Sequence, residues 1–151
     1  MINNRNGSVL ELFVSKKGHQ ERFSKKSVKI DGNGVVDDKY YAKNSERSIL
    51  ITSVDSYRLA EENGVEASYS SLGENILIDI NPYGMVPGDR LKIGNALLEI
   101  TQNCTLCNSL SKVDSRLPKI LESSRGIFAK AVNDAVVRKG DTVDILKQDY
   151  K

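Results

Sequence analysis

Short apolar runs separated by turn residues recur along the chain, and this spacing limits the possible fold more than any other feature of the sequence. The runs hold three to seven residues and are rich in Val, Ile and Leu, a pattern typical of strands and too short for most helices. They cover residues 9–14, 27–30, 48–52, 75–80, 91–93, 96–101, 126–132, 135–137 and 142–145. The sequence therefore predicts about eight or nine short strands in a mainly β, barrel-like domain.

Turn residues mark where several of these strands begin. Gly88-Asp89 precedes the run at 91–93, and Gly140-Asp141 precedes the run at 142–145 in the same way. Asn133-Asp134 predicts a tight turn between its two neighbouring runs, which would form a hairpin.

One segment has clear helical character, and one or two others are short. Ser53 can cap a helix over residues 53–63, Asp55 favours its first turn, and Gly64 suits the position after its last turn. A shorter helical piece is expected around 117–122. No βαβ unit is visible in this pattern.

The size and charge of the chain exclude several classes of protein. With 151 residues it is expected to form a single domain, residues 1–151. Two cysteines and no segment resembling a secretion signal indicate a cytoplasmic protein, and no apolar run is long enough to cross a membrane. Residues 1–30 hold seven Lys/Arg against two Glu, but no aromatic residues interleave with the lysine clusters, so we expect no nucleic-acid partner.

The only histidine, His19, follows Gly18 in a predicted turn and is expected to be exposed. A single histidine makes a metal site of several imidazoles hard to build. Residues 35–41, which gather carboxylates, a lysine and two tyrosines, are either an ordinary polar loop or the rim of a pocket, and alone they favour the ordinary loop.

Both cysteines lie at a junction between a strand and a predicted helical turn. Cys107 precedes a segment whose free backbone amides would lower the pKa of a neighbouring thiol, so it is the candidate nucleophile or soft metal ligand. The alternatives are that Cys104 and Cys107 are small buried hydrophobic residues, or a thioredoxin-like redox pair, which needs a βαβ unit. Spacing alone does not decide between these interpretations.

An ordered series of motifs resembles the MOSC domain, named from the C-terminal domain of molybdenum-cofactor sulfurase and found also as small stand-alone bacterial proteins. The series, which extends over a core of about residues 8–147, comprises Gly34 with Asp38, Arg47, Leu72-Gly73-Glu74-Asn75, residues 88–94, Leu98–Thr101 leading into Cys104-Thr105-Leu106-Cys107, residues 126–132, and Gly140-Asp141. In one departure, Tyr40 stands where many stand-alone members have a histidine.

The resemblance implies a β-barrel like that of MOSC and pyruvate-kinase barrel domains, and a function centred on the Cys107 thiolate. That thiolate would bind molybdenum in a molybdopterin cofactor, in an enzyme that reduces N-hydroxylated compounds, or would carry sulfur as a persulfide. The cofactor-binding candidates are Arg47, Gly73, Glu74, Asn75, Thr101 and Cys107. An electron-donor or sulfur-donor protein is the expected partner, and nothing resembles a pyridoxal phosphate site. The alternative is a non-catalytic carrier or interaction module with a structural CxxC.

Overall fold

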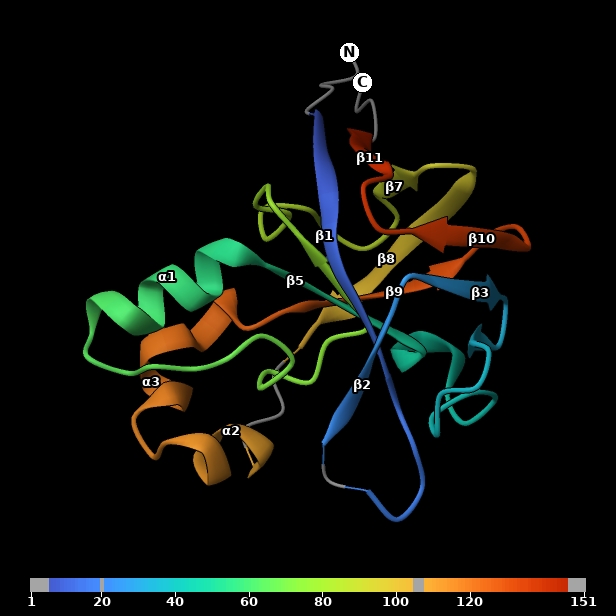
Figure 1. Ribbon diagram of the computed structural model, residues 1–151. Helices are drawn as coiled ribbons and strands as arrows, with labels where there is room; N and C mark the ends of the chain where they lie inside the picture. The colour runs from blue at the N-terminus through green and yellow to red at the C-terminus, as the bar shows by residue number, and fades with distance from the viewer. Residues whose placement is uncertain (1–5, 20, 105–107, 147–151) are drawn as a thin grey trace.

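A closed barrel of seven strands forms the body of the protein. The computed structural model describes residues 6–19, 21–104 and 108–146. Around the barrel the strands follow the order β1 (Asn6–Ser15), β6 (Ile76–Ile78), β5 (Ile49–Ser53), β9 (Ile127–Ala131), β8 (Ala96–Asn103), β7 (Arg90–Ile93) and β11 (Thr142–Leu146). Pairing of β11 with the start of β1 closes the barrel. This arrangement, drawn in Figure 1, confirms the predicted mainly β barrel.

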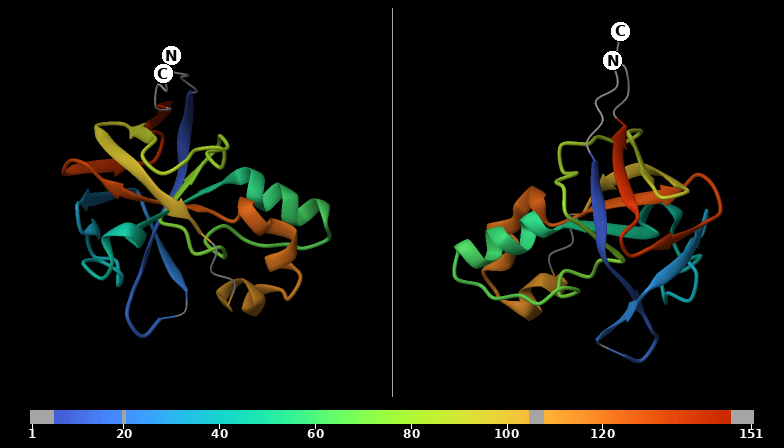
Figure 2. Two further views of the ribbon diagram at one scale, coloured as in Figure 1. Left: turned by 180° about the vertical axis from the view of Figure 1, so that it is seen from behind. Right: turned by 45° about the horizontal axis from the view of Figure 1, so that its top comes forward.

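A hairpin, a small second sheet and a helical layer surround the barrel. The C-terminal part of β1, from Leu12 to Ser15, pairs with β2 (Arg22–Lys25). A separate sheet holds β10 (Ala135–Arg138), β3 (Ser27–Asp31) and β4 (Gly34–Val35). The helical segments are η1 (Ser45–Arg47), α1 (Val54–Glu62), α2 (Asn108–Val113), α3 (Leu117–Leu121) and η2 (Glu122–Ser124). Figure 2 shows α1, α2 and α3 on one side of the barrel and β3 with β10 on the other. No helix among the described residues is long and apolar enough to cross a membrane.

The barrel interior is the main apolar core. Strands β7 and β11, each of which follows a Gly-Asp turn, lie next to each other. Ile93 is opposite Val143 and Leu91 is opposite Ile145, and all four are fully or almost fully buried. These residues alternate with exposed or partly exposed ones, as the side-chain period of a strand requires. A second apolar cluster, which includes Tyr57 from α1, packs under the helical layer.

The predicted helix is confirmed, with the cap that its sequence indicated. Ser53 has an extended backbone and its Oγ accepts a hydrogen bond from the Asp55 N–H at 3.1 Å. After the helix, Gly64 adopts a φ of +81°, which a residue with a Cβ rarely adopts.

The predicted hairpin at Asn133-Asp134 is wrong. Strand β9 pairs with β8 and β5, whereas β10 pairs with β3 in the other sheet. The Asn133 side chain accepts a hydrogen bond from the Leu97 N–H at 2.9 Å and donates one to the Asn95 carbonyl at 3.0 Å. These bonds tie the turn to the β7–β8 connection, so the chain leaves the barrel instead of folding back along β9.

The expectation that the chain holds no βαβ unit is also wrong. Strands β5 and β6 are parallel and adjacent, and α1 lies in the connection between them. Parallel neighbours require such a crossover. This unit lies away from the cysteine segment in the sequence and positions residues 70–75, which lead into β6.

Candidate functional site

A cavity of about 900 Å³ opens at one end of the barrel. Its walls come from the β1–β2 hairpin, the loop between β4 and β5, the segment before β6, and α2. Leu50 and Phe128, each 7% exposed, form an apolar part of its lining. A volume of this size lies within the range typical of sites for small organic ligands.

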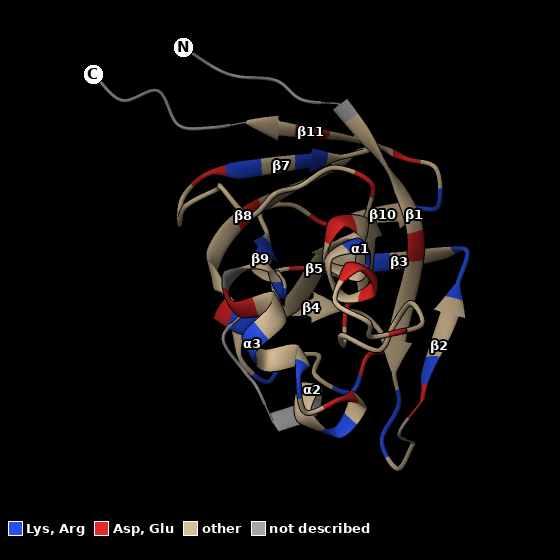
Figure 3. Ribbon diagram, turned by 90° about the vertical axis from the view of Figure 1, so that its left-hand side faces the viewer, with Lys and Arg blue, Asp and Glu red and all other residues tan. Residues whose placement is uncertain are grey.

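Positive charge dominates the cavity lining. Six Lys and Arg side chains line it: Arg22, Lys39, Lys43, Arg47, Lys112 and Arg125. Among the described residues that line the cavity, Glu21 is the one carboxylate. Glu21 already lies 3.4 Å from His19 Nδ1. Within the described part of the chain, no ion pair involves Arg22, Lys43, Arg47 or Lys112. Figure 3 shows, in blue, Lys and Arg positions along the hairpin and on α2.

Gly73 lies between two of the guanidinium groups. Its φ is +88°, and a Cβ built there would stand 3.4 Å from Arg22 Nη2 and 3.9 Å from Arg125 Nη2. Glycine therefore both permits this backbone conformation and leaves open the space toward two like charges. Such a space is suited to an anion, because guanidinium groups bind phosphate and carboxylate through paired N–H donors.

Contacts with the Leu72 carbonyl and with Cys104 hold the Arg125 side chain in place at the cavity. It is only 4% exposed, and its Nη2 donates a hydrogen bond to the Leu72 carbonyl at 3.2 Å. Its Nη1 contacts the Sγ of Cys104, which is 1% exposed and packs with Leu50 and Phe128. Burial of Cys104 agrees with the interpretation of this cysteine as a small buried hydrophobic residue.

Asn75 joins the segment before β6 to both neighbouring strands. Its Oδ1 accepts a hydrogen bond from the Leu50 N–H at 3.1 Å, and its Nδ2 donates to the Phe13 carbonyl and to Asp38 Oδ1, each at 3.2 Å. Asp38, 5% exposed, also accepts from the Ser15 N–H at 2.6 Å. These bonds fix the wall of the cavity to which Gly73 and Asn75 belong.

Glu74 points away from the cavity lining into the protein interior, where it is fully buried. Its Oε2 accepts hydrogen bonds from Tyr57 Oη at 2.6 Å and from the Ser70 N–H at 3.1 Å. Burial raises the pKa of the Glu74 carboxyl, and burial together with the nearby Glu74 charge raises the pKa of Tyr57. The pair anchors residues 70–74 against α1.

The residues proposed from the resemblance are only partly brought together. Arg47, Gly73 and Asn75 line the cavity, and Glu74 lies behind it. Thr101 lines a separate pocket of about 440 Å³, and its Oγ1 donates to the Glu46 carbonyl at 2.5 Å, next to Arg47. Cys107 lies outside the described residues.

Sequence reasoning missed most of the cations at this site. Arg22, Lys39, Lys43 and Lys112 come from a hairpin, a loop and a helix, so no run of charge in the sequence shows that they share a cavity. The segment 35–41 is open to two interpretations from its sequence, an ordinary polar loop, which it favours, or the rim of a pocket, and it contributes Lys39 and Tyr40 to the rim. His19 is exposed as predicted and also borders the cavity.

Comparisons with known proteins agree with this architecture. The crystal structure of YuaD from Bacillus subtilis superposes with a TM-score of 0.87 at 15% identity, over 99% of this chain and 100% of that chain. YiiM from Geobacillus stearothermophilus gives a TM-score of 0.73 at 16% identity, over 94% and 75% of the two chains, and YiiM from Escherichia coli gives 0.68 at 14%, over 97% and 72%. These likenesses show the fold. No curated protein matches the chain significantly.

A model of the MOSC domain matches residues 37–144, which include the loop of Lys39 and Lys43, the segment of Gly73 and the strand that precedes the cysteines. Since this match spans more than half of the chain, the protein belongs to the MOSC domain family.

Proposed function

We propose that this protein binds molybdenum cofactor in the cationic cavity. The observation that carries the proposal is the pair of guanidinium groups, Arg22 and Arg125, that face the open side of Gly73. The cofactor's pterin carries a phosphate, and two guanidinium groups at one point satisfy a phosphate better than isolated lysines. Arg47, which lines the same cavity without an ion pair among the described residues, would add a third.

The remaining candidates from the sequence would support the cofactor in different ways. Gly73 and Asn75 line the cavity and would contact the cofactor directly. Glu74 would fix their segment through Tyr57. Thr101 would position Arg47, because it holds the preceding carbonyl of η1. The apolar side chains Leu50 and Phe128 would pack against the ring system of the cofactor.

We propose the thiolate of Cys107 as the ligand of molybdenum. We also propose that the protein works in the cytoplasm, where reducing conditions keep this cysteine as a free thiol. Cys107 directly precedes Asn108, where α2 begins, and α2 contributes Val113 to the cavity. Cys104, three residues earlier, contacts Arg125 at the same cavity. Cations near a thiol favour its ionised form. The sequence neighbours of Cys107 on both sides thus support the proposal.

The activity that we propose, from the resemblance to the MOSC family, is reduction of N-hydroxylated compounds. The reaction R–NHOH + 2e⁻ + 2H⁺ → R–NH₂ + H₂O breaks the N–O bond and consumes two electrons. When bound, the cofactor supplies the redox-active centre, and a donor protein supplies the electrons. The role of this chain's own residues is to bind and orient the cofactor through its arginines.

Elemental analysis tests the proposal after expression in a host that makes the cofactor. We expect near-stoichiometric molybdenum and pterin in the wild-type protein. Arg22→Gln should lower both, and Cys107→Ser should lower molybdenum. The matched control is Lys29→Gln, which removes an exposed cation on β3 outside the cavity and should retain the cofactor. Protein that carries neither metal nor pterin would contradict the proposal.

A carrier that holds the cofactor or a persulfide without catalysis is the alternative. The loaded protein can be assayed with an N-hydroxylated base and an artificial electron donor. Turnover supports the reductase, whereas stoichiometric cofactor without turnover supports the carrier.

A further inference from the structure

The cavity holds more positive charge than the cofactor's phosphate requires. A phosphate monoester carries about 1.5 to 2 negative charges at neutral pH. The three arginines Arg22, Arg47 and Arg125 suffice for such a group, which leaves Lys39, Lys43 and Lys112 in the same lining. Among the described residues none of these lysines forms an ion pair. Like charges that converge repel one another, so an anionic ligand is favoured there.

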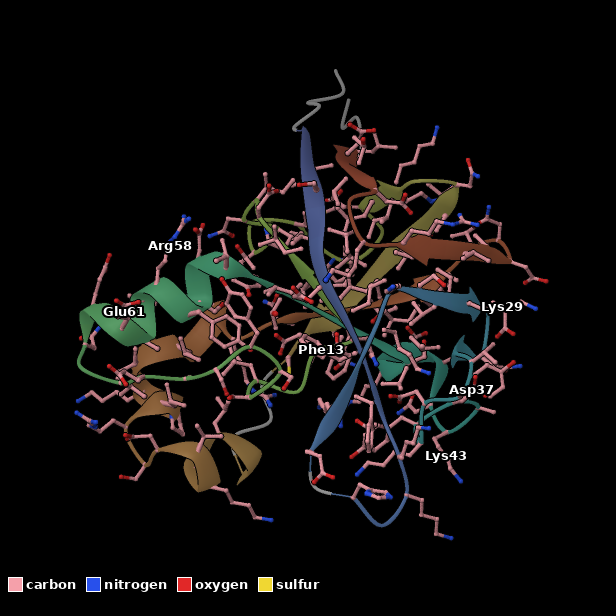
Figure 4. The ribbon with its side chains drawn as sticks, viewed as in Figure 1. Phe13, Lys29, Asp37, Lys43, Arg58 and Glu61 are labelled. Carbon is pink, nitrogen blue, oxygen red and sulfur yellow. The ribbon has the colours of Figure 1, made fainter. Side chains whose placement is uncertain are left out.

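The three lysines approach the cavity from two directions. Lys39 and Lys43 belong to the loop between β4 and η1, on which Figure 4 labels Lys43, and Lys112 belongs to α2. Figures 1 and 2 show this loop and α2 on opposite sides of the β1–β2 hairpin. A ligand between the two walls can therefore be held from both sides.

Hydrogen bonds within the loop and to the neighbouring β3 and β3–β4 turn hold the loop that carries Lys39 and Lys43 in place. The Tyr40 N–H donates to Asp38 Oδ2 at 3.0 Å, and the Ala42 N–H donates to the Asn33 carbonyl at 2.8 Å. Tyr41 Oη donates to Asp31 Oδ2 at 2.5 Å. A wall ordered before binding loses less conformational entropy when a ligand arrives.

Apolar side chains accompany the lysines on both walls. Tyr40, 48% exposed, lies next to Lys39, whose Nζ is 5.0 Å from the Tyr40 ring centroid. Val113, 42% exposed, follows Lys112 on α2. Tyr40 and Val113 both line the cavity. Large apolar side chains exposed beside a concave site favour a ligand with an organic, partly apolar body.

We propose that the substrate bound at this site is an organic anion, with a carboxylate or phosphate group held by Lys39, Lys43 and Lys112. Its apolar part contacts Tyr40 and Val113. That this ligand is the substrate rests on the proposed cofactor function, whereas the anion site itself is independent of it.

Titration of ¹⁵N-labelled protein, followed by NMR, tests the site with three probes of similar shape. Phenyl phosphate and benzoate are anionic, and benzamide is neutral. At constant ionic strength, we expect the amides of Tyr40 and Ala42 to shift, and the anions to bind at least about tenfold more tightly than benzamide. Both the cofactor-loaded and the cofactor-free protein are titrated.

The variant Lys43→Gln/Lys112→Gln should weaken binding of both anions about tenfold and leave cofactor content unchanged. Its control, Lys29→Gln/Lys92→Gln, removes the same charge from exposed positions on β3 and β7 and should bind like the wild type. Equal affinity for benzamide and benzoate, or unchanged anion binding in the first variant, would overturn the proposal. Loss of cofactor in that variant would also overturn it, because the lysines would then serve the cofactor.

The two proposals fail in distinguishable ways. Protein that lacks molybdenum and pterin but binds benzoate through Lys43 and Lys112 would refute the cofactor function and retain the anion site. Loaded protein in which neither anion shifts Tyr40 or Ala42 would retain the cofactor function and refute the anion site.

Discussion

Replacement of Glu74 by Gln should change how the stability of the protein depends on pH. Glu74 is fully buried, and its Oε2 accepts hydrogen bonds from Tyr57 Oη and the Ser70 N–H. Gln can keep both bonds through its amide oxygen and carries no charge at any pH. The variant therefore isolates the cost of burying a carboxylate.

The expected effect follows from the raised pKa of the Glu74 carboxyl. Between the ordinary value of 4.5 and the higher folded-state pKa, the unfolded chain is deprotonated at this residue while the folded protein keeps the proton. Within that window the free energy of unfolding falls by up to about 1.4 kcal/mol per pH unit as pH rises. Below pH 4.5 both states are protonated, so the contribution is fully present there. Above the folded-state pKa the loss is complete.

Urea unfolding measured at intervals from pH 4 to pH 8 provides the assay. The free energy of unfolding of Glu74→Gln, minus that of the wild type, should rise with pH through this window, since other titrating groups cancel in the difference. Glu61→Gln, which removes an exposed carboxylate on α1, is the matched control and should run parallel to the wild type. A difference between Glu74→Gln and the wild type that does not change with pH would refute the reasoning.

Three further changes test the structure around the site. Asn75→Ala removes three buried hydrogen bonds and should lower the free energy of unfolding by about 3 kcal/mol in urea titrations, and a loss below 1 kcal/mol would contradict the bonding described. Gly73→Ala places a Cβ at a φ of +88° and should lower the free energy of unfolding by about 1 to 2 kcal/mol, together with the molybdenum content. Unchanged stability and unchanged molybdenum content would show that this position does not need a glycine. Ser53→Ala removes the cap of α1 and should cost about 1 kcal/mol, seen as a lower thermal midpoint by circular dichroism; an unchanged midpoint would show that the cap is dispensable.

The barrel could be predicted because its strands carry local signals. Alternation in Arg90–Ile93 and the Gly-Asp turn before it are enough to indicate a strand with one buried face. Strand β2 was not predicted, since Arg22–Lys25 holds a single apolar residue and gains its pairing from the C-terminal part of β1. Strand β10 pairs with β3 more than a hundred residues earlier in the chain, and no local pattern encodes that choice.

The site was less predictable than the fold. The resemblance pointed to Gly73 and Asn75, which line the cavity, because their segment forms a recognisable motif. Arg22 and Lys112 carry no such signal, since each is an ordinary charged residue in its own element. They become a site only when the hairpin and α2 converge on one cavity, which is a property of the tertiary structure.

Some site residues also hold the fold together and others do not, and this decides which of them can test function. Asn75 lines the cavity, but it also joins β1 to β5 through both its backbone and its side chain, so its replacement lowers stability together with any binding. Lys43 and Lys112 are exposed, and among the described residues neither forms an ion pair, so their loss should cost the fold little. A change in ligand affinity in these lysine variants can therefore be assigned to the site itself.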